Sequence, residues 1–272
     1  MQAERLLSLA AQVAGEHRSA DVLAAIIKGL AAESGVALAR IWLRGPGDLC
    51  DKGCFLLKEC ADHRECLHLA ASAGSSKDQT EQWSSIEGRY FQRIPIGGRK
   101  LDVIGVAGKS ILVQDVPQDK EWILRPEWAR KEGISSFAGH PLISRGQILG
   151  VMVIFSRLPV TEQEFGWLRM FADQAAVAIT NAQAFEALQQ AKALQEQQSE
   201  QLRQVIDLAP MHMFLWEADG SASYGNRKSA EYFGEIPQKP PMEFLDLVTH
   251  PDDAGKLKEA VQKSLARGEP IG

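Results

Sequence analysis

The sequence predicts a mixed α/β (α+β) fold with a long connecting helix, and three observations support this. Apolar residues recur at helical spacing near the N-terminus, and they alternate at strand spacing from residue 36 onward. A continuous helical pattern then runs from residue 163 to residue 209. The 272 residues, 45% hydrophobic and 24% charged, match an ordinary globular protein with one large domain or two small ones.

The charge and the hydropathy of the chain exclude two classes of partner. The formal net charge is −5 and the pI about 5.8, so no basic field attracts nucleic acid or an anionic membrane. No apolar run approaches the roughly 20 residues that cross a bilayer, and the N-terminus does not resemble a signal peptide. We therefore expect a cytoplasmic protein that binds neither nucleic acid nor membranes.

Two amphipathic helices are predicted at the N-terminus. Residues 4–14 place their leucines and Val13 on one stripe, and residues 20–34 repeat this pattern. Ser19 is expected to cap the second helix, and Gly35 is expected to end it.

Strands are predicted from alternation and from turn residues. Residues 36–44 alternate and predict a half-buried strand, and residues 66–74 predict a second one. The polar stretch 74–92 predicts a loop with a short helix, and the apolar run 110–116 predicts a third strand.

A short helix and a hairpin follow. Residues 126–131 predict a helix with proline in its first turn. Residues 137–144 and 147–156 predict two strands joined by the two-residue turn Arg145-Gly146.

A capping box predicts where the long helix begins, because Thr161 precedes Glu164 by three residues. The stripe that this helix is predicted to bury consists of Phe165, Leu168, Phe171, Ala172, Ala175 and Ile179. Further along, a heptad seam is formed by Ala184, Leu188, Ala191, Gln195, Gln198, Leu202 and Val205. Glutamines at core positions weaken a coiled coil but can fix its register. We expect a homodimer through this linker helix; the alternative is a solvated connecting helix.

Another pattern begins after Pro210, which is expected to end the helix. Residues 213–217 and 221–224 predict two strands, and Asn226 can cap a helix that starts at the next residue. A last amphipathic helix follows. Two strands make a poor sheet, so we expect the natural protein to continue with further strands and an output domain.

Residues 1–183 resemble a GAF domain, a sensory α/β module. The resemblance depends on the segments ALARIWLR, SILVQDVPQD, GISSFAGHPLISRGQILGVMVIFS and TEQEFGWLRMFADQAAVAITNA. It implies a central antiparallel sheet flanked by helices, with a cysteine-rich insertion at residues 45–66. Residues 184–206 then form a coiled-coil linker.

Residues 207–272 resemble the first half of a PAS domain, on the segments DLAPMHMFLWEADGSASYGN and THPDDAGKL. A GAF domain, a helix and a truncated PAS domain together resemble the input region of a bacterial signalling protein, most often a sensor histidine kinase. No catalytic motif lies in the chain itself. We interpret His250 as ordering a loop through Asp252 or Asp253, and not as a phosphoryl acceptor.

All the cysteines lie in the segment CDKGCFLLKECADHREC, at Cys50, Cys54, Cys60 and Cys66. In a reducing compartment a tight cluster favours metal or redox chemistry over a disulfide framework. Four thiolates suit an iron–sulfur cluster or tetrahedral zinc. The spacing matches neither zinc ribbons nor bacterial ferredoxins, so the choice between these cofactors stays open. A subset of bacterial GAF sensors carries similar four-cysteine insertions.

Other interpretations of the cysteines remain. They can form a thiol–disulfide switch or be inert, and His63 or His68 can replace one of them as a ligand. His68 alternates within a predicted strand, however, and we interpret it as a packed or surface strand residue in preference to a ligand. Some GAF proteins reduce free methionine sulfoxide with cysteines near the middle strand. The corresponding segment here, GVAGKSILVQDVPQDKEW, has no cysteine, which argues against that enzyme.

The GAF resemblance also implies a ligand pocket between the sheet and the loops of residues 101–133. Its candidate lining residues are Trp122, Trp128, Phe137 and His140, and its ligand is an unnamed small molecule. The leading hypothesis is a sensor of redox state or oxygen that uses the cysteine-bound centre. The alternative is a small-molecule sensor in which the cysteines hold a structural zinc.

Overall fold

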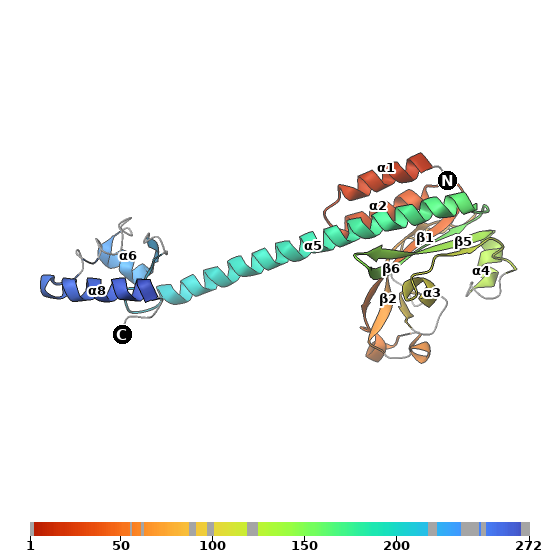
Figure 1. Ribbon diagram of the computed structural model, residues 1–272. Helices are drawn as coiled ribbons and strands as arrows, with labels where there is room; N and C mark the ends of the chain where they lie inside the picture. The colour runs from red at the N-terminus through yellow and green to blue at the C-terminus, as the bar shows by residue number, and fades with distance from the viewer. Residues whose placement is uncertain are drawn as a thin grey trace. The chain divides into compact units, whose positions relative to one another are not determined.

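The computed structural model describes residues 3–54, 56–60, 63–86, 91–96, 101–118, 125–216, 222–234, 245 and 249–267. The chain divides into two compact units, Met1–Gln189 and Gln190–Gly272 (Figure 1). One helix, α5 (Glu162–Asp207), begins in the first unit and ends in the second. Among the described residues, no helix has both the length and the apolar character needed to cross a membrane.

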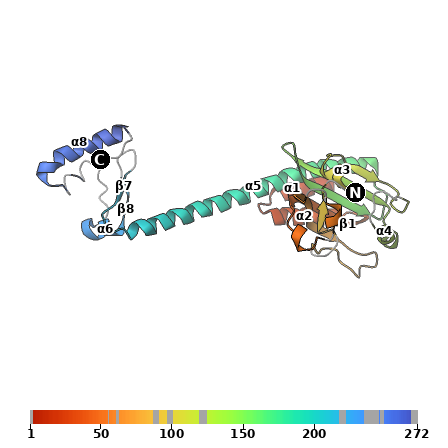
Figure 2. The same ribbon diagram turned by 90° about the horizontal axis from the view of Figure 1, so that it is seen from below.

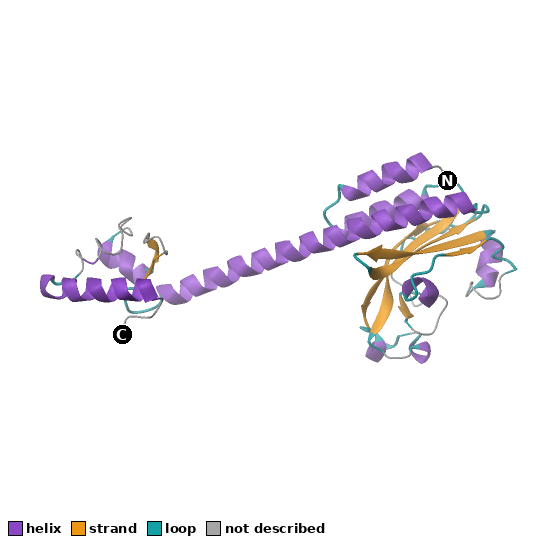
Figure 3. Ribbon diagram, in the orientation of Figure 1, coloured by secondary structure: helices purple, strands orange, loops and turns teal. Residues whose placement is uncertain are grey.

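A six-stranded sheet forms the centre of the first unit, in the order β3-β2-β1-β6-β5-β4 (Figure 3). Every neighbouring pair in it is antiparallel. The mixed α/β fold with an antiparallel sheet is therefore confirmed. The strands are β1 (Val36–Pro46), β2 (Glu65–Gly74), β3 (Arg93–Pro95), β4 (Ile111–Val113), β5 (Ser136–Ser144) and β6 (Gln147–Ser156).

The two faces of this sheet have different covers. Helices α1 (Ala3–Ala14) and α2 (Ser19–Ala31) lie with the first part of α5 on one face (Figure 1). The other face carries the shorter helices α3 (Leu101–Gly105) and α4 (Pro126–Glu132), together with loops. Each face has its own cluster of buried apolar side chains.

Strand β1 is covered on both faces, so the prediction of a half-buried strand was wrong. Ala39 and Ile41 belong to the cluster on the side of the long helices, whereas Ala37 and Trp42 belong to the opposite cluster. Alternation in a sequence shows that two faces differ, but it cannot show that the less apolar face is also covered.

Local capping signals were partly correct. The predicted capping box is present, because the Glu164 carboxylate accepts hydrogen bonds from the Thr161 N–H and hydroxyl, each at 2.9 Å. Ser19 is not the cap of α2, since the capping position is Arg18. Instead Ser19 donates from its N–H at 2.9 Å and its hydroxyl at 2.7 Å to Glu186 on α5. Gly35 (φ +86°) lies in the turn beyond the end of α2 at Ala31.

The hairpin between β5 and β6 is confirmed. Its turn residues Arg145 (φ 51°) and Gly146 (φ 76°) both have positive φ, the geometry that matches the twist of two-residue hairpins. Two short elements, β3 and α3, were not predicted, because a few residues carry too little periodicity. Within the described part of residues 74–92 there is no helix.

The second unit contains a hairpin of β7 (Phe214–Trp216) and β8 (Ala222–Gly225), which Figure 2 shows beside α6 (Arg227–Phe233). As predicted, Asn226 caps α6, with its side-chain oxygen accepting from the Ser229 N–H. Its amide also donates to the carbonyls of Ile206 and Met211, so this buried residue ties the end of α5 to the hairpin. Helix α8 (Pro251–Arg267) completes the described part.

Two glycines offer a matched test of the packing. A Cβ at Gly150 on β6 would lie 2.0 Å from the Trp42 carbonyl oxygen, whereas a Cβ at Gly166 on α5 would meet nothing within 4 Å. We expect Gly150→Ala to lower the free energy of unfolding by about 2 kcal/mol or more, because the central strands cannot separate. Gly166→Ala should raise it by about 0.5–1 kcal/mol through helix propensity. Urea unfolding of the two variants measures both values, and equal effects would contradict the tight β1–β6 contact.

Candidate functional site

The cysteine-rich segment connects the end of β1 to the start of β2. It contains two short 3-10 turns, Cys50–Lys52 and Leu57–Glu59, and Gly53 with a φ of 87°. Its base is held to the sheet, because the Gly47 N–H donates to the Arg64 carbonyl at 2.9 Å. The sheet therefore fixes the two ends of the segment.

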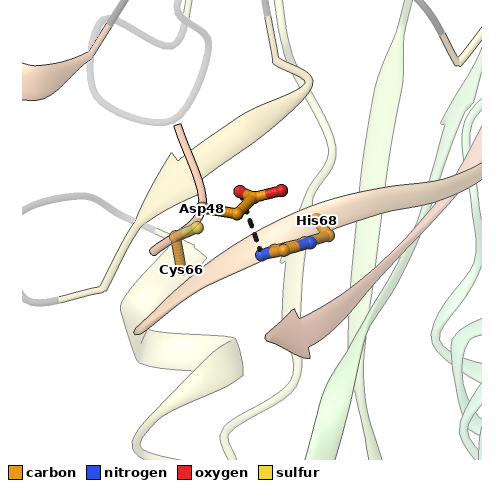
Figure 4. Close-up of side chains that lie close together, drawn as sticks. All are labelled: Asp48, Cys66 and His68. Atoms are coloured by element: carbon orange, nitrogen blue, oxygen red, sulfur yellow. Dashed lines mark ion pairs between the residues drawn. The ribbon is translucent and has the colours of Figure 1, made fainter. Parts of the chain in front are cut away.

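Three different ligand types meet at this base. The ligand atoms of Asp48, Cys66 and His68 all lie within 4.8 Å of one another (Figure 4). Cys66 and His68 are two residues apart on β2 and therefore point to the same side of the strand. Asp48 comes from the loop after β1. A thiolate, an imidazole and a carboxylate are together a donor set that zinc and other transition metals accept.

Without a metal, these groups have protein partners. Arg93 on β3 donates to both oxygens of Asp48, at 2.8 and 2.6 Å, and holds the pKa of that carboxyl down to about 2. His68 Nε2 lies 2.8 Å from the Pro46 carbonyl oxygen and 3.8 Å from Asp48. Burial raises the pKa of Cys66 to about 11, so its thiol is protonated when no metal is bound.

The other three cysteines lie in the segment between β1 and β2. Cys50 donates a weak hydrogen bond to the His63 carbonyl, with sulfur and oxygen 3.6 Å apart. Burial, and then the negative charges of Cys60 and Cys54, raise the pKa of Cys50. Cys50 and Cys54 likewise raise the pKa of Cys66. The thiols thus interact electrostatically, but within the described residues Cys66 alone belongs to the ligand group.

The candidate pocket residues are not all together. Trp128 and Phe137 both belong to the apolar cluster on the face with α3 and α4. His140 points to the opposite face, where its ring lies 4.4 Å from that of Phe165 on α5. Trp122 lies outside the described residues. His140 therefore cannot line a pocket with Phe137, because residues three apart on a strand have opposite orientations.

His140 is an unusual core residue. It is 1% exposed, its Nδ1 lies 3.0 Å from the Ser110 hydroxyl, and its Nε2 has no hydrogen-bond partner among the residues that the structure describes. Burial, assisted by the charge of Arg169, lowers the pKa of His140 to about 4, so the ring is neutral in the folded protein.

Asp48 and Arg93 are parts of the site that the sequence did not predict. Asp48 stands in the turn GPGD, where an aspartate is expected for turn formation alone. Arg93 is on β3, which was not predicted, and it lies opposite His68 in the β2–β3 pair. Only this pairing brings Arg93 next to the loop after β1.

The sequence matches the GAF domain family over residues 3–179. The chain therefore belongs to the GAF domain family, a sensory and signalling module. A comparison with curated proteins gives no match.

Solved structures with a similar fold include a GAF domain of a phosphoenolpyruvate-protein phosphotransferase from Coxiella burnetii. It is 20% identical, covers 69% of this chain and 99% of its own, and has a TM-score of 0.47. A free methionine-R-sulfoxide reductase from Neisseria meningitidis is 19% identical, with coverages of 66% and 88% and a TM-score of 0.46. A methyl-accepting chemotaxis protein is 18% identical, with coverages of 66% and 99% and a TM-score of 0.45.

His140 predicts a pH dependence of stability. Its pKa is about 4 in the folded chain and about 6.5 when unfolded. The unfolded state therefore binds the extra proton, and the contribution of His140 to stability is complete above about pH 6.5 and lost as the pH falls toward 4. Between pH 7 and about pH 4.5, we expect the free energy of unfolding of His140→Gln to fall by about 2–3 kcal/mol less than that of wild type.

Urea unfolding at both pH values measures this difference. His250→Gln is the control, because the His250 side chain is 71% exposed and should leave the wild-type profile unchanged. Parallel profiles for wild type and His140→Gln would show that His140 is not buried in its neutral form.

Proposed function

We propose that this chain is the sensory input region of a signalling protein and that its cysteine-rich segment binds a thiolate-ligated metal centre. Membership of the GAF family supports the sensory part. The observation that carries the metal part is the ligand group of Asp48, Cys66 and His68, with the thiols of Cys50 and Cys54 close enough to shift the pKa of Cys66.

The residues present fit such a centre in two ways. A single zinc or iron ion can take Cys66, His68 and Asp48, with a loop cysteine as fourth ligand. An iron–sulfur cluster instead needs the four cysteines, so the segment would have to close around it. In both cases metal binding displaces the proton from Cys66, because the thiolate is the ligand.

The segment is well placed to pass a change to the sheet. Cys66 pairs with Gly45 of β1 and with Pro95 of β3, so a shift at this residue acts on three strands. If Asp48 served as a metal ligand, its ion pair with Arg93 would weaken, and this would alter the contact between the loop and β3. Loss of the centre would restore the contact between Asp48 and Arg93, so the segment would have two states.

We further infer that the second unit is the first half of a PAS domain that precedes an output domain, such as a histidine kinase. The support is the β7–β8 hairpin, followed by the helix that Asn226 caps and by the segment THPDDAGKL at the start of α8. These elements agree in order with the resemblance to PAS domains.

A cysteine variant tests the metal centre. The chain is purified without oxygen, and its iron, zinc and acid-labile sulfide are counted together with its absorption spectrum. Iron with matching sulfide and absorbance near about 400 nm would make the centre a redox or oxygen sensor, whereas one zinc without colour would make it a structural site. We expect Cys66→Ser to lose more than about 90% of the metal, because it removes the buried thiolate.

Glu65→Gln is the matched control. Glu65 precedes Cys66 in the chain but forms an ion pair with Arg44, so this variant should keep the metal. Wild-type protein without stoichiometric metal, or Cys66→Ser with the full amount, would overturn the metal centre and leave the GAF assignment intact.

The linker part of α5 supports a homodimer. Leu188, Leu202 and Val205 of the predicted heptad seam are 66%, 63% and 67% exposed in the single chain. Large apolar side chains on a solvated helix are stabilised by a second helix that covers them. We infer that a second copy of this chain provides that helix.

Two aspartates on the seam should separate the dimer. We expect Leu188→Asp/Leu202→Asp to raise the dimer dissociation constant by about a hundredfold or more, because each aspartate places a charge within the apolar contact between the two helices. Light scattering after size exclusion, over a range of concentrations, measures this. The control Gln190→Asp/Gln197→Asp adds the same charge on the opposite side of the helix. A monomeric wild type, or a dimer that both variants leave equally stable, would contradict the seam.

A further inference from the structure

A charged residue lies in the middle of the sheet face that carries α3 and α4. Arg40 is on β1, one of the two central strands, and it pairs with Ser72 of β2 and Val153 of β6. It shares a face with Trp42, and therefore with the apolar cluster that includes Val153, Phe137 and Ile104. A half-buried guanidinium is unexpected among such neighbours.

Arg40 has few polar partners. Its Nε donates to the Ser72 hydroxyl at 3.2 Å, and its guanidinium lies 5.9 Å from the Trp42 ring and 5.8 Å from the Phe91 ring. Among the residues that the structure describes, no carboxylate pairs with it. By contrast, Arg93 pairs with Asp48, and Arg157 pairs with Glu132.

The surroundings of Arg40 resemble a site prepared for an anion. Burial lowers the pKa of Arg40 to about 10, because its surroundings solvate the positive charge less well than water does. An arginine has five N–H donors, of which the described contacts use one. The remaining donors form the planar fork that binds carboxylate or phosphate groups through two parallel hydrogen bonds.

The aromatic residues around Arg40 are tied in place. The Trp42 ring N–H donates to the Phe91 carbonyl at 2.8 Å, and the Ser72 hydroxyl that receives Arg40 Nε donates to the Trp83 carbonyl. The Trp83 ring in turn lies 5.4 Å from that of Trp128 on α4. Of these aromatic side chains, Trp42 and Phe91 lie next to the guanidinium, and an aromatic neighbour suits a ligand with an apolar body next to its anionic group.

We propose that Arg40 is the anchor of a binding site for a small organic anion, whose carboxylate or phosphate group meets the guanidinium and whose apolar part lies against Phe91. The site is independent of the cysteine-rich segment and gives the domain a second input. The alternative is a purely structural role for Arg40, in which its contacts to Ser72 and Phe91 would stabilise the loop before β3. The two roles make opposite predictions for the free protein.

Tryptophan fluorescence and thermal unfolding of the full chain test the proposal, with benzoate and phenyl phosphate as probes and benzamide as the neutral analogue. We expect a saturable response to at least one anion, and binding of benzamide at least about tenfold weaker. The anion that binds more tightly identifies the class of ligand. Arg40→Gln should weaken anion binding about tenfold or more, while the exposed turn variant Arg145→Gln, with the same charge change, should not.

Thermal unfolding of an Arg40 variant without ligand distinguishes a ligand-binding role of Arg40 from a purely structural one. We expect Arg40→Met to unfold at the same temperature as wild type or higher, because it removes an unpaired charge from apolar surroundings. Should the Gln and Met variants fail to fold, Arg40→Lys keeps the charge but loses the planar fork, and it is expected to bind the anion several-fold more weakly. Equal anion binding by Arg40→Gln or Arg40→Lys, or no saturable response of the wild type to either anion, would overturn the proposal.

Discussion

The burial of the central strands on both faces is the constraint on which this structure depends. Strands β1 and β6 lie in the middle of the sheet, and their side chains belong alternately to two separate apolar clusters. Such strands must be covered twice. The long helices α1, α2 and α5 cover one face, and short helices with loops cover the other. Gly150 allows the two strands to approach closely between these layers, because a side chain there would meet the Trp42 carbonyl.

The same constraint separates the residues of the proposed metal site from the core. Toward its end, β1 becomes exposed at alternate residues, Arg44 and Pro46 being less buried than Ile41 and Trp42. At this end the sheet carries Cys66, His68 and Arg93, which are polar or ionisable. A change in ligands here affects strand ends and one loop, and leaves both apolar clusters intact. Arg40 is the exception, because it places a charge inside the covered region.

Rules that act over a few residues predicted much of the fold. The capping box at Thr161, the turn at Arg145-Gly146 and the cap at Asn226 follow from local geometry, and all three are present. The Glu186 contact to Ser19 joins residues 167 positions apart, so no local rule could find it. The site shows the same division. Its cysteines were visible as a cluster, but Arg93 joins Asp48 only through the pairing of a three-residue strand. That Phe137 and His140 lie on opposite faces of the sheet follows from strand periodicity alone, because they are three residues apart.

The helix α5 connects these parts, because one continuous element has two different environments. Its first turns bury Leu168, Phe171 and Ile179 against the sheet, and its later turns expose Leu188 and Leu202. A helix is stiff along its length, so a small rotation of the buried stripe also rotates the exposed seam. Gln195 and Gln198 in that seam limit the energy that a partner helix gains from one register. In the proposed dimer, a weak seam on a stiff helix would change register at a low cost, and transmission of a signal from the sheet would need this property.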